Sequence, residues 1–386
     1  MPAETVKASR IQALDSVRGM ALLGILILNI SGFALPRAGY MNPTYLGVPS
    51  FSDAAVWSVL NVTAQGSFLA MFALLFGASL ALLRQRSATW NLSRLGWLAM
   101  LGFFHGVWLW EGDILLTYAA VGMGAVIVMR SSSSPRGMLR TGIVLFVIGL
   151  LLMLWMGTLV DSSSSADWTP SVVDLDREAA WKLTGGEVAR GERLSMTLSV
   201  LFSVFLQYGW QLMGTMLIGA ALTECGWLKG EWRIADYRRQ GWLWMLIALA
   251  IKGGAVALQW RFDWQLATAG YYLQTVKELG SVLQGLAYMA LWFGYGQSAM
   301  LAPVGRCLAK VGRMTLSNYL LQTLVCTTLF YRLGGYRHFD RLSLLAIVPA
   351  VWAINLAFSL LWLRYFRQGP VEWLWRRVTD AVVPVR

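Results

Sequence analysis

Charged side chains are scarce in this chain, and so are histidine and cysteine. Asp, Glu, Lys and Arg make up 13% of 386 residues, with two histidines and three cysteines. A soluble domain carries roughly a quarter charged residues, so a water-exposed globular fold is excluded. Cys225, Cys307 and Cys326 are odd in number and far apart in the sequence, which excludes a disulfide framework and a cysteine-based metal site. We expect no metal site and no tightly bound cofactor.

Long apolar runs occupy most of the chain, which is 57% hydrophobic. A run of about 18 or more apolar residues spans the roughly 30 Å hydrocarbon core of a bilayer, where only helices and closed barrels satisfy their backbone hydrogen bonds. These runs do not alternate in polarity as barrel strands do. The sequence therefore predicts an all-α polytopic bundle, a single transmembrane domain over residues 1–386 with about ten transmembrane helices. The expected spans are 17–35, 55–83, 92–110, 113–130, 138–160, 196–223, 241–260, 281–300, 314–333 and 342–363.

The net charge of +12 reflects basic residues that cluster between the apolar runs. Most basic residues fall in segments that share one side if the N-terminus is cytoplasmic, as the positive-inside rule requires. This predicts cytoplasmic termini, a periplasmic loop at about 161–194 and a basic cytoplasmic tail at about 364–386. A short helix is expected around Asp174–Leu183 of the loop. The location that fits is a bacterial inner membrane, with the lipid bilayer as partner and no nucleic acid.

Polar residues inside the first span are candidates for function, because burying them in hydrocarbon is costly. Asp15 and Arg18 are three residues apart and share a helix face at the inner interface. Asn29 follows about 21 Å further along the axis, at 1.5 Å per residue. The alternative is structural: an ion pair at a helix start and an asparagine bonded to a neighbouring helix.

His105 and Asp113 lie on either side of a turn between two short apolar segments, HGVWLWEGDILLTYA. Such a helical hairpin brings an imidazole and a carboxylate together, and histidine accepts and returns protons near neutral pH. The carboxylate would orient the ring. Tyr118 adds a hydroxyl nearby. The structural alternative is a histidine that only hydrogen-bonds between helices.

Amides form the remaining candidates. Asn318 and Gln322 are four residues apart on one helix face, and Gln65 lies within the second span. They either hold a polar ligand or join helices, and joining helices is the better supported alternative. Lys252 is isolated near the middle of its span, where it either has a function, reaches to the interface along its aliphatic stem or meets a backbone carbonyl.

Several segments resemble the YeiB-like family of bacterial membrane proteins. They are LDSVRGMALLGILILNISGFALP, FLAMFALLFGASL, RLGWLAMLGFFHGVWLWEGDILLTYAAVG, QYGWQLMGTMLIGAAL, GRMTLSNYLLQT and WLRYFRQGPVEWLWRRVT, which together extend over nearly the whole chain. The LDSVRG opening is also distantly similar to the transmembrane acyltransferase superfamily. In its type-3 group, the helix opened by this motif carries a catalytic histidine. That place is Asn29 here, and His105, at similar expected depth, is the substitute.

This resemblance implies a transmembrane acyltransferase that takes an acyl group from a cytoplasmic thioester resembling acyl-coenzyme A. The acceptor would be a small molecule, glycan or lipid at the periplasmic side or in the membrane. His105 would be the base or would first take the acyl group itself, Asp113 would be its partner and Asn29 an oxyanion donor. Basic residues at the inner ends of the helices would bind the donor phosphates: Arg18, Arg84, Arg86 and Arg94. A transporter or channel for a small polar solute and a non-catalytic scaffold are the alternatives, and a homo-oligomer stays open.

Overall fold

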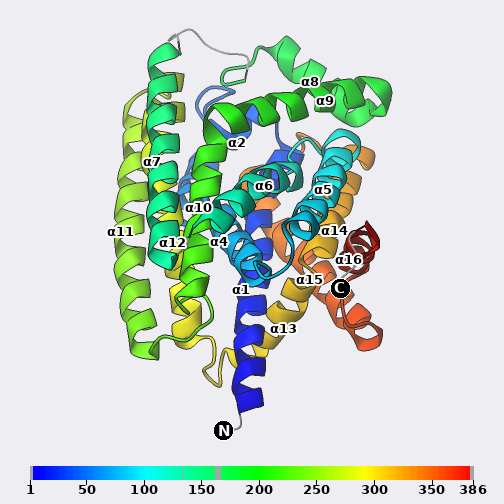
Figure 1. The fold of residues 1–386 in the computed structure, drawn as a ribbon. Helices are drawn as coiled ribbons and strands as arrows, with labels where there is room; N and C mark the ends of the chain where they lie inside the picture. The colour runs from blue at the N-terminus through cyan, green and yellow to red at the C-terminus, as the bar shows by residue number, and fades with distance from the viewer. Residues whose placement is uncertain (1–2, 133, 161–166, 383–386) are drawn as a thin grey trace.

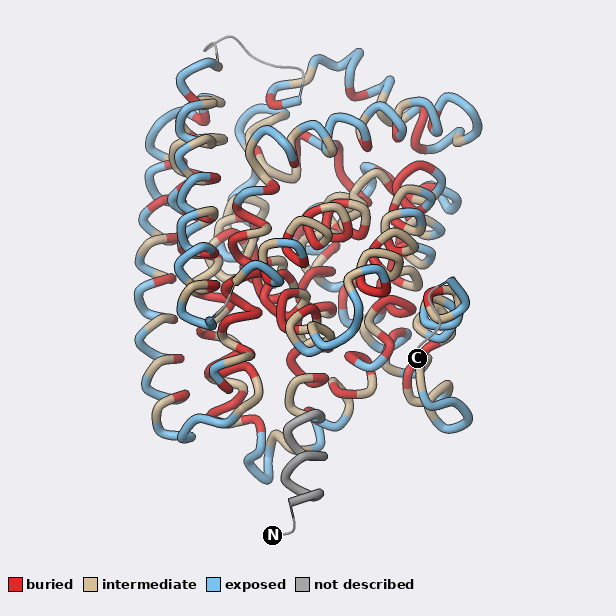
Figure 2. Tube along the Cα trace, in the orientation of Figure 1, coloured by how far each residue is buried: buried red, intermediate tan, exposed pale blue. Residues whose placement is uncertain are grey.

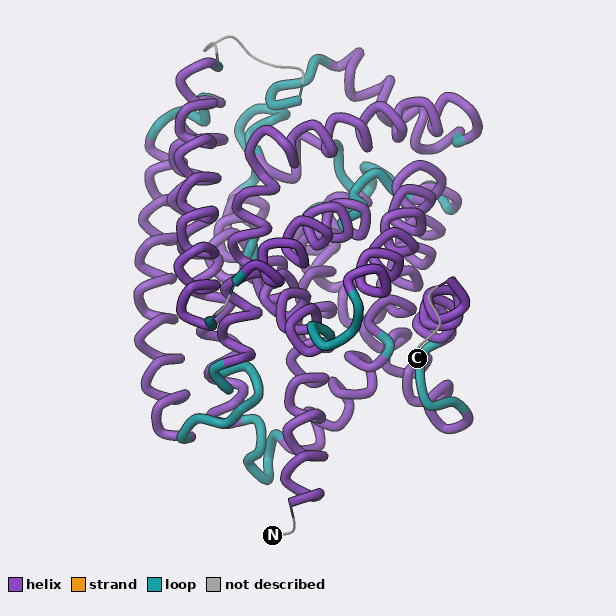
Figure 3. Tube along the Cα trace, viewed as in Figure 1, coloured by secondary structure: helices purple, strands orange, loops and turns teal. Residues whose placement is uncertain are grey.

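The computed structural model describes residues 3–132, 134–160 and 167–382, with side chains from residue 12 onward. All regular structure in these residues is helical, and no strand occurs among them (Figure 3). The predicted all-α class is confirmed. Ser162–Ser165, in the expected periplasmic loop, and residues 383–386 of the expected tail lie outside the described residues.

The elements follow one another with short connections. In chain order they are α1 (Ala3–Ala34), α2 (Arg37–Met41), α3 (Phe51–Thr63), α4 (Ser67–Leu82), α5 (Ala88–Phe104), η1 (His105–Leu109), α6 (Leu115–Ser131), α7 (Pro135–Leu159), α8 (Val172–Thr184), α9 (Gly186–Ser203), η2 (Val204–Tyr208), α10 (Gly209–Glu224), α11 (Ile234–Arg261), η3 (Leu266–Tyr272), α12 (Leu273–Tyr295), α13 (Ala302–Arg313), α14 (Thr315–Thr327), η4 (Thr328–Arg332), α15 (Arg341–Tyr365) and α16 (Pro370–Val382). The four η elements are π-helical turns. The short helix expected around 174–183 is α8.

Six helical stretches of the described chain are long and apolar enough to cross a membrane. They are Gln12–Ala34, Phe51–Leu82, Pro135–Leu159, Gly186–Glu224, Ile234–Arg261 and Arg341–Tyr365. The prediction of about ten such spans is wrong. The other four expected spans are helical but are not long and apolar enough to meet the same standard. α6 has 17 residues and α14 has 13. α5 carries the charged Arg94, and α12 carries Lys277 and Glu278. Length and composition of the six indicate a membrane protein.

Two of these long helices are at the left of Figure 1. α7 packs against α10, α11 packs against α12, and much of the surface of both is exposed in Figure 2. The exposed side chains are large and apolar, among them Leu151 and Trp155 of α7 and Leu246 of α11. An apolar surface of this extent is foreign to soluble monomers and suits hydrocarbon.

α1 runs through the centre and packs against α13 with almost no space between backbones. A Cβ atom on Gly312 would lie 1.8 Å from the carbonyl oxygen of Asp15, and one on Gly19 would lie 2.1 Å from that of Leu308. The Ser16 hydroxyl donates to the Gly305 carbonyl at 2.8 Å. Glycines at this crossing let two helices far apart in sequence touch directly.

The second stretch is broken between α3 and α4. Gly66 has a φ of +74°, and the Ser281 hydroxyl lies 2.5 Å from the place of a Cβ atom there. Only glycine tolerates both conditions. The break releases the Gln65 carbonyl from the helical ladder and turns it towards α11 and α12.

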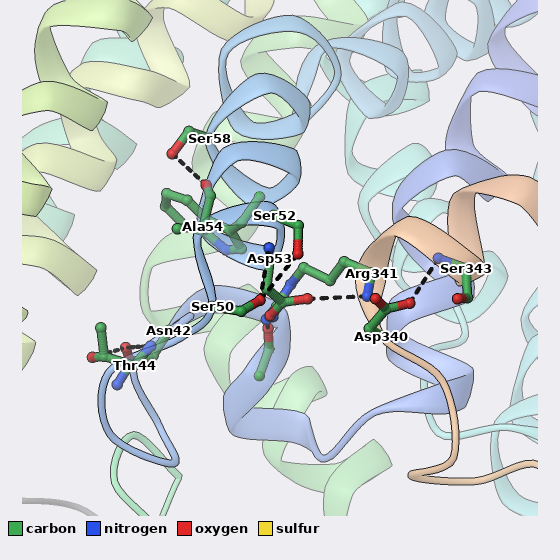
Figure 4. A network of polar contacts seen from close by, with 12 residues as sticks. Asn42, Thr44, Ser50, Ser52, Asp53, Ala54, Ser58, Asp340, Arg341 and Ser343 are labelled. Atoms are coloured by element: carbon green, nitrogen blue, oxygen red, sulfur yellow. Dashed lines mark hydrogen bonds and ion pairs between the residues drawn. The ribbon is translucent and has the colours of Figure 1, made fainter.

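A polar clasp joins α3 to α15 at the end of the bundle remote from the N-terminus (Figure 4). The Arg341 guanidinium pairs with the Asp53 carboxylate and donates to the Gly39 carbonyl, and the Arg341 amide donates to Asp53 at 3.0 Å. Asp340 caps α15 by accepting from the Ser343 amide at 2.9 Å. α8 and α9 lie across this same end (Figure 1).

Candidate functional site

A cavity of about 640 Å³ lies among α1, α4, α5, α6, α14 and α16. Its wall combines aliphatic and aromatic side chains with a charged rim. The lining residues are Asp15, Arg18, Leu22, Ile25, Phe72, Leu75, Phe76, Ser79, Leu80, Leu82, Leu83, Arg94, Leu98, Ile114, Leu115, Tyr118, Gly312, Arg313, Thr315, Leu316, Tyr319, Arg367, Gln368, Glu372, Trp375 and Arg376. The volume is within the range of small-molecule sites.

The rim carries an excess of positive charge, with five arginines against two carboxylates. Arg18 donates to Asp15 at 2.9 Å and to the Ser79 hydroxyl at 3.0 Å. The Arg94 guanidinium lies 3.9 Å from the centre of the Trp375 ring, a cation–π contact. Arginine in this setting favours phosphate or carboxylate groups of a ligand.

α16 forms one wall of the cavity. Glu372 accepts from the backbone amides of Leu316 at 2.7 Å and Ser317 at 3.1 Å, and the Ser317 hydroxyl also donates to it. The carboxylate thereby caps the start of α14. The Trp375 indole donates to the Arg94 carbonyl at 2.8 Å. The C-terminal segment therefore completes a site that the first half of the chain begins.

Two buried tyrosines, Tyr118 and Tyr319, line the cavity beside its apolar side chains. The Tyr118 hydroxyl donates to the Leu69 carbonyl at 3.0 Å. The Tyr319 hydroxyl accepts from the Ile114 amide at 3.4 Å. Each tyrosine is nearly fully buried, and Tyr319 stands between the cavity and His105.

His105 begins η1 directly behind Tyr319, with 5.1 Å between the two ring centres. Its Nδ1 is 2.8 Å from Asp113 Oδ1, and its Nε2 is 2.9 Å from the Thr323 hydroxyl. Asp113 Oδ2 accepts from the Leu116 amide at 2.8 Å, which caps α6 and fixes the carboxylate. A carboxylate at Nδ1 favours the neutral tautomer with its proton on that nitrogen, and in this tautomer Nε2 is an acceptor beside the Thr323 oxygen. The imidazole is oriented as a general base would be.

A buried cluster of ion pairs joins the turn after η1 to α8 and α9. The Lys182 ammonium of α8 lies 2.8 Å from Glu111 and 2.9 Å from Glu178, and Arg193 Nε of α9 lies 3.5 Å from Glu111. Burial alone would raise the pKa of Glu111, but the neighbouring Lys182 ammonium outweighs burial and the pKa is lowered. Burial alone would lower the pKa of Lys182, but Glu111 and Glu178 outweigh it and the pKa is raised. Glu111 precedes Asp113 by two residues, so this cluster anchors the turn that carries the His105 partner.

Three of the candidate residues from the inner and outer ends of the helices lie outside the cavity wall. Arg84 pairs with Glu224 at 2.8 Å, and Arg86 is exposed, with its guanidinium 5.6 Å from the centre of the Trp90 ring. Asn29 is half-buried on α1. Of the basic residues expected to meet the donor, the structure brings Arg18 and Arg94 together at the cavity.

Gln65 belongs to a second polar cluster at the α3–α4 break. The Lys252 ammonium donates to the Gln65 carbonyl at 2.7 Å, the Ser67 hydroxyl at 3.0 Å and Gln284 Oε1 at 2.8 Å. Lys277 donates to Asn61 Oδ1 at 3.0 Å and to Gln65 Oε1 at 3.2 Å. Lys252 is therefore not isolated: its three hydrogens meet the acceptors that the helix break exposes.

Asn318 and Gln322 face α15, away from the cavity. Asn318 donates to the Ser359 hydroxyl at 2.8 Å, and Gln322 donates to Asn355 Oδ1 at 3.1 Å. The Asn355 amide returns a bond to Asn318 Oδ1 at 3.1 Å. These amides join two helices, which is the structural alternative weighed for them.

Sequence reasoning missed the rim residues that come late in the chain, and Thr323. Arg313, Arg367 and Arg376 line the cavity beside Arg18 and Arg94. The signal for Arg376 was present, because residues 370–382 are amphipathic and follow an apolar span closely. Among the described residues, no group of three or more His, Cys, Asp and Glu side chains is arranged to hold a metal ion.

Comparison with known proteins places the chain in a family. It is 47% identical to the uncharacterised protein YeiB of Escherichia coli strain K12, over 95% of each chain. The chain belongs to the YeiB-like family. This YeiB-like chain is also similar to the uncharacterised YxaH of Bacillus subtilis strain 168, with 29% identity over 97% of this chain and 95% of YxaH. Residues 222–381 match the family described as protein of unknown function, DUF418. No solved structure matches this YeiB-like chain.

Proposed function

We propose that this YeiB-like protein is a bacterial inner-membrane acyltransferase. It would take an acyl group from a cytoplasmic anionic thioester such as an acyl-coenzyme A and pass it to a hydroxyl or amine acceptor at the periplasmic side or in the membrane. One observation carries the proposal: a cavity lined by five arginines and by apolar side chains includes Tyr319, whose ring centre lies 5.1 Å from that of a histidine oriented by a carboxylate.

The topology proposed for this reaction has both termini in the cytoplasm. The five arginines that line the cavity would then lie on the cytoplasmic side, where the donor is made: Arg18, Arg94, Arg313, Arg367 and Arg376. α8 and α9 lie at the opposite, periplasmic end (Figure 1). The donor would enter at the arginines, and its acyl chain would lie against the apolar side chains, where each buried methylene contributes about 0.8 kcal/mol.

The chemistry assigned to His105 conserves atoms and charge. The acceptor oxygen or nitrogen bonds to the thioester carbonyl carbon, and its proton passes to His105 Nε2. The carbon–sulfur bond then breaks, and the imidazolium returns the proton to the leaving thiolate. The acceptor takes the place at Nε2 that the Thr323 hydroxyl holds at 2.9 Å. Tyr319, which lines the cavity, donates its hydroxyl hydrogen to the developing oxyanion, the role first assigned to Asn29.

The test is thiol release from acyl-coenzymes A of several chain lengths by purified protein in nanodiscs. His105→Gln should reduce the rate by about 10² to 10⁴, the usual effect of losing a general base. His338→Gln, which changes the exposed histidine of an outer loop, is the matched control and should leave the rate unchanged. Equal rates in the two variants would contradict the assignment of the base.

Donor binding is tested separately from catalysis. A ligand that binds the folded state raises thermal stability by mass action. An acyl-coenzyme A should raise the melting temperature of the wild-type protein, and Arg94→Gln should weaken this shift. Arg86→Gln, which changes an exposed arginine outside the cavity wall, should not. Absence of any shift across chain lengths would remove the support for an acyl-thioester donor.

A second candidate function is transport of a small polar solute, and the Lys252–Lys277 cluster favours it. Two buried lysines at a helix break are costly in hydrocarbon and typical of solute pathways. Transport predicts uptake of solute into proteoliposomes that Lys252→Met abolishes and His105→Gln leaves intact. The acyltransferase predicts the reverse dependence for thiol release.

A further inference from the structure

The outward face of α16 is composed of aromatic, aliphatic and arginine side chains. Trp373 and Leu374 are 47% and 55% exposed, and Arg376 and Arg377 are exposed beside them. The Arg377 guanidinium lies 5.1 Å from the centre of the Trp373 ring, one helical turn away. We call these four residues the α16 outer face. Free in water, this face would leave a large indole and a leucine unpartnered.

Hydrogen bonds to the bundle fix the rotation of α16 about its axis. Glu372 caps α14, the Trp375 indole donates to the Arg94 carbonyl, and the Trp90 indole donates to Asp380 at 3.0 Å. Both carboxylates of α16 take part in these contacts, and Asp380 Oδ2 also lies 3.9 Å from Arg376 Nε. The four residues of the α16 outer face carry two positive charges, and Asp380 offsets only the charge of Arg376.

The approach to α16 places it at the end of an apolar helix. α15 ends at Tyr365, and residues 366–369 separate it from α16. Arg364, Tyr365, Phe366 and Arg367 in this turn are all exposed. Aromatic rings and arginines together are the composition of a membrane–water interface, where rings reach the acyl boundary and guanidinium groups stay among phosphates.

We infer that the α16 outer face binds the surface of an anionic phospholipid bilayer. The helix would lie in the plane of the cytoplasmic interface, with Trp373 and Leu374 at the acyl boundary and Arg376 and Arg377 on lipid phosphates. Arg367 and Arg376 also line the cavity, so lipid headgroups would border its rim. This inference does not depend on acyl transfer, because it follows from the composition and orientation of α16.

A spin label at Leu374→Cys tests it, in a Cys225→Ser, Cys307→Ser background that keeps the buried Cys326. The full-length protein is placed in nanodiscs of phosphatidylcholine alone or with phosphatidylglycerol. In anionic nanodiscs, we expect the label to be accessible to oxygen and shielded from a water-soluble nickel chelate. Replacing Arg376 and Arg377 with Gln should reduce the ratio of inserted to exposed label about 30-fold, since each basic residue near an anionic surface contributes about fivefold.

The control changes two exposed arginines at the other end of the bundle, Arg261→Gln with Arg332→Gln, and should leave the ratio unchanged. A label equally accessible to the nickel chelate in both lipid compositions would overturn the inference. So would dipolar coupling between labels on two copies, which would assign the α16 outer face to a dimer contact. If the double variant unfolds, the labelled protein with both arginines intact is measured at high salt instead. Salt screens the attraction between arginines and lipid phosphates, so the label should become accessible to the nickel chelate. A label that stays shielded at high salt would overturn the inference.

Discussion

Replacing Lys182 with methionine should release α8 from the bundle. Methionine fills a similar length without charge. In the wild-type protein the Lys182 side chain has no exposed surface, and its ammonium serves Glu111 at 2.8 Å and Glu178 at 2.9 Å. After the change, Glu111 stays buried and keeps the Arg193 contact at 3.5 Å, but it loses the ammonium at 2.8 Å. Removing one partner of a buried ion pair typically costs about 3–5 kcal/mol.

The matched control is Arg177→Met on the same helix. Arg177 pairs with Glu192 at the same 2.8 Å, but its side chain is 75% exposed. A surface pair of this kind contributes about 0–1 kcal/mol. The double variant Lys182→Met, Glu111→Gln should recover part of the loss, because it also removes the stranded charge. The two ion pairs have the same length, but the difference in burial predicts a large loss of stability for Lys182→Met and a small one for Arg177→Met.

The measurement is amide hydrogen exchange over residues 172–184. A local opening free energy lowered by 3–5 kcal/mol accelerates exchange roughly 100- to 5,000-fold, at 1.36 kcal/mol per factor of ten. Acceleration of less than about fivefold in Lys182→Met would refute the reasoning, since the ammonium would then be dispensable to the docked helix.

The same cluster should give the α8 contact a defined pH range. Glu111 has a lowered pKa, so its contribution is present above the ordinary glutamate value of about 4.3 and is lost as the pH falls through the lower folded value. Lys182 has a raised pKa, so its contribution is present below about 10.4 and is lost only as the pH rises through the higher folded value. Protection of α8 should therefore be constant from about pH 5 to 10 and fall in acid.

Two further predictions concern packing and the cavity wall. Gly312→Ala should destabilise the protein by at least about 1–3 kcal/mol in thermal unfolding, because its Cβ would meet the Asp15 backbone carbonyl; Gly253→Ala, a helical glycine with open space, should be neutral or stabilising. A loss no larger than that of the control would mean that the helices separate freely. Glu372→Gln should speed exchange in α16 and weaken donor binding, since the carboxylate caps α14. Glu187→Gln, 94% exposed, should do neither, and equal effects would contradict the capping role.

The hydrophobic runs in the sequence predicted where the helices lie, because in hydrocarbon a run of this length must form its backbone hydrogen bonds within a helix. The runs did not distinguish helices that can cross a membrane from shorter ones. α6 is apolar but has 17 residues, and α14 has 13 residues with several polar side chains, so their place in the bundle depends on packing against neighbours, which is a tertiary property. The break at Gly66 was also missed, since a glycine in an apolar run indicates close packing as readily as a positive φ.

For the candidate site, local spacing succeeded where the chain turns back at once. His105 and Asp113 are eight residues apart, and the turn between them leaves few arrangements other than contact. Spacing failed for long-range partners. Nothing near Gln65 in the sequence points to Lys252, and the residues after 364 were expected to form a tail, whereas α16 folds back onto α5 and α14. Such contacts depend on how α11, α12 and α16 close the bundle.

The crossing of α1 with α13 has a consequence for biosynthesis. The Ser16 hydroxyl and the Gly305 carbonyl that it meets are 289 residues apart, so the first helix leaves the ribosome long before its partner exists. At about 5–20 residues per second, this interval is roughly 15–60 s. During that time α13, against which the surface around Gly19 packs, has not yet been synthesised. A ribosome stalled before α13 would leave an inserted but unassembled first helix, the kind of orphan that membrane quality-control proteases act on.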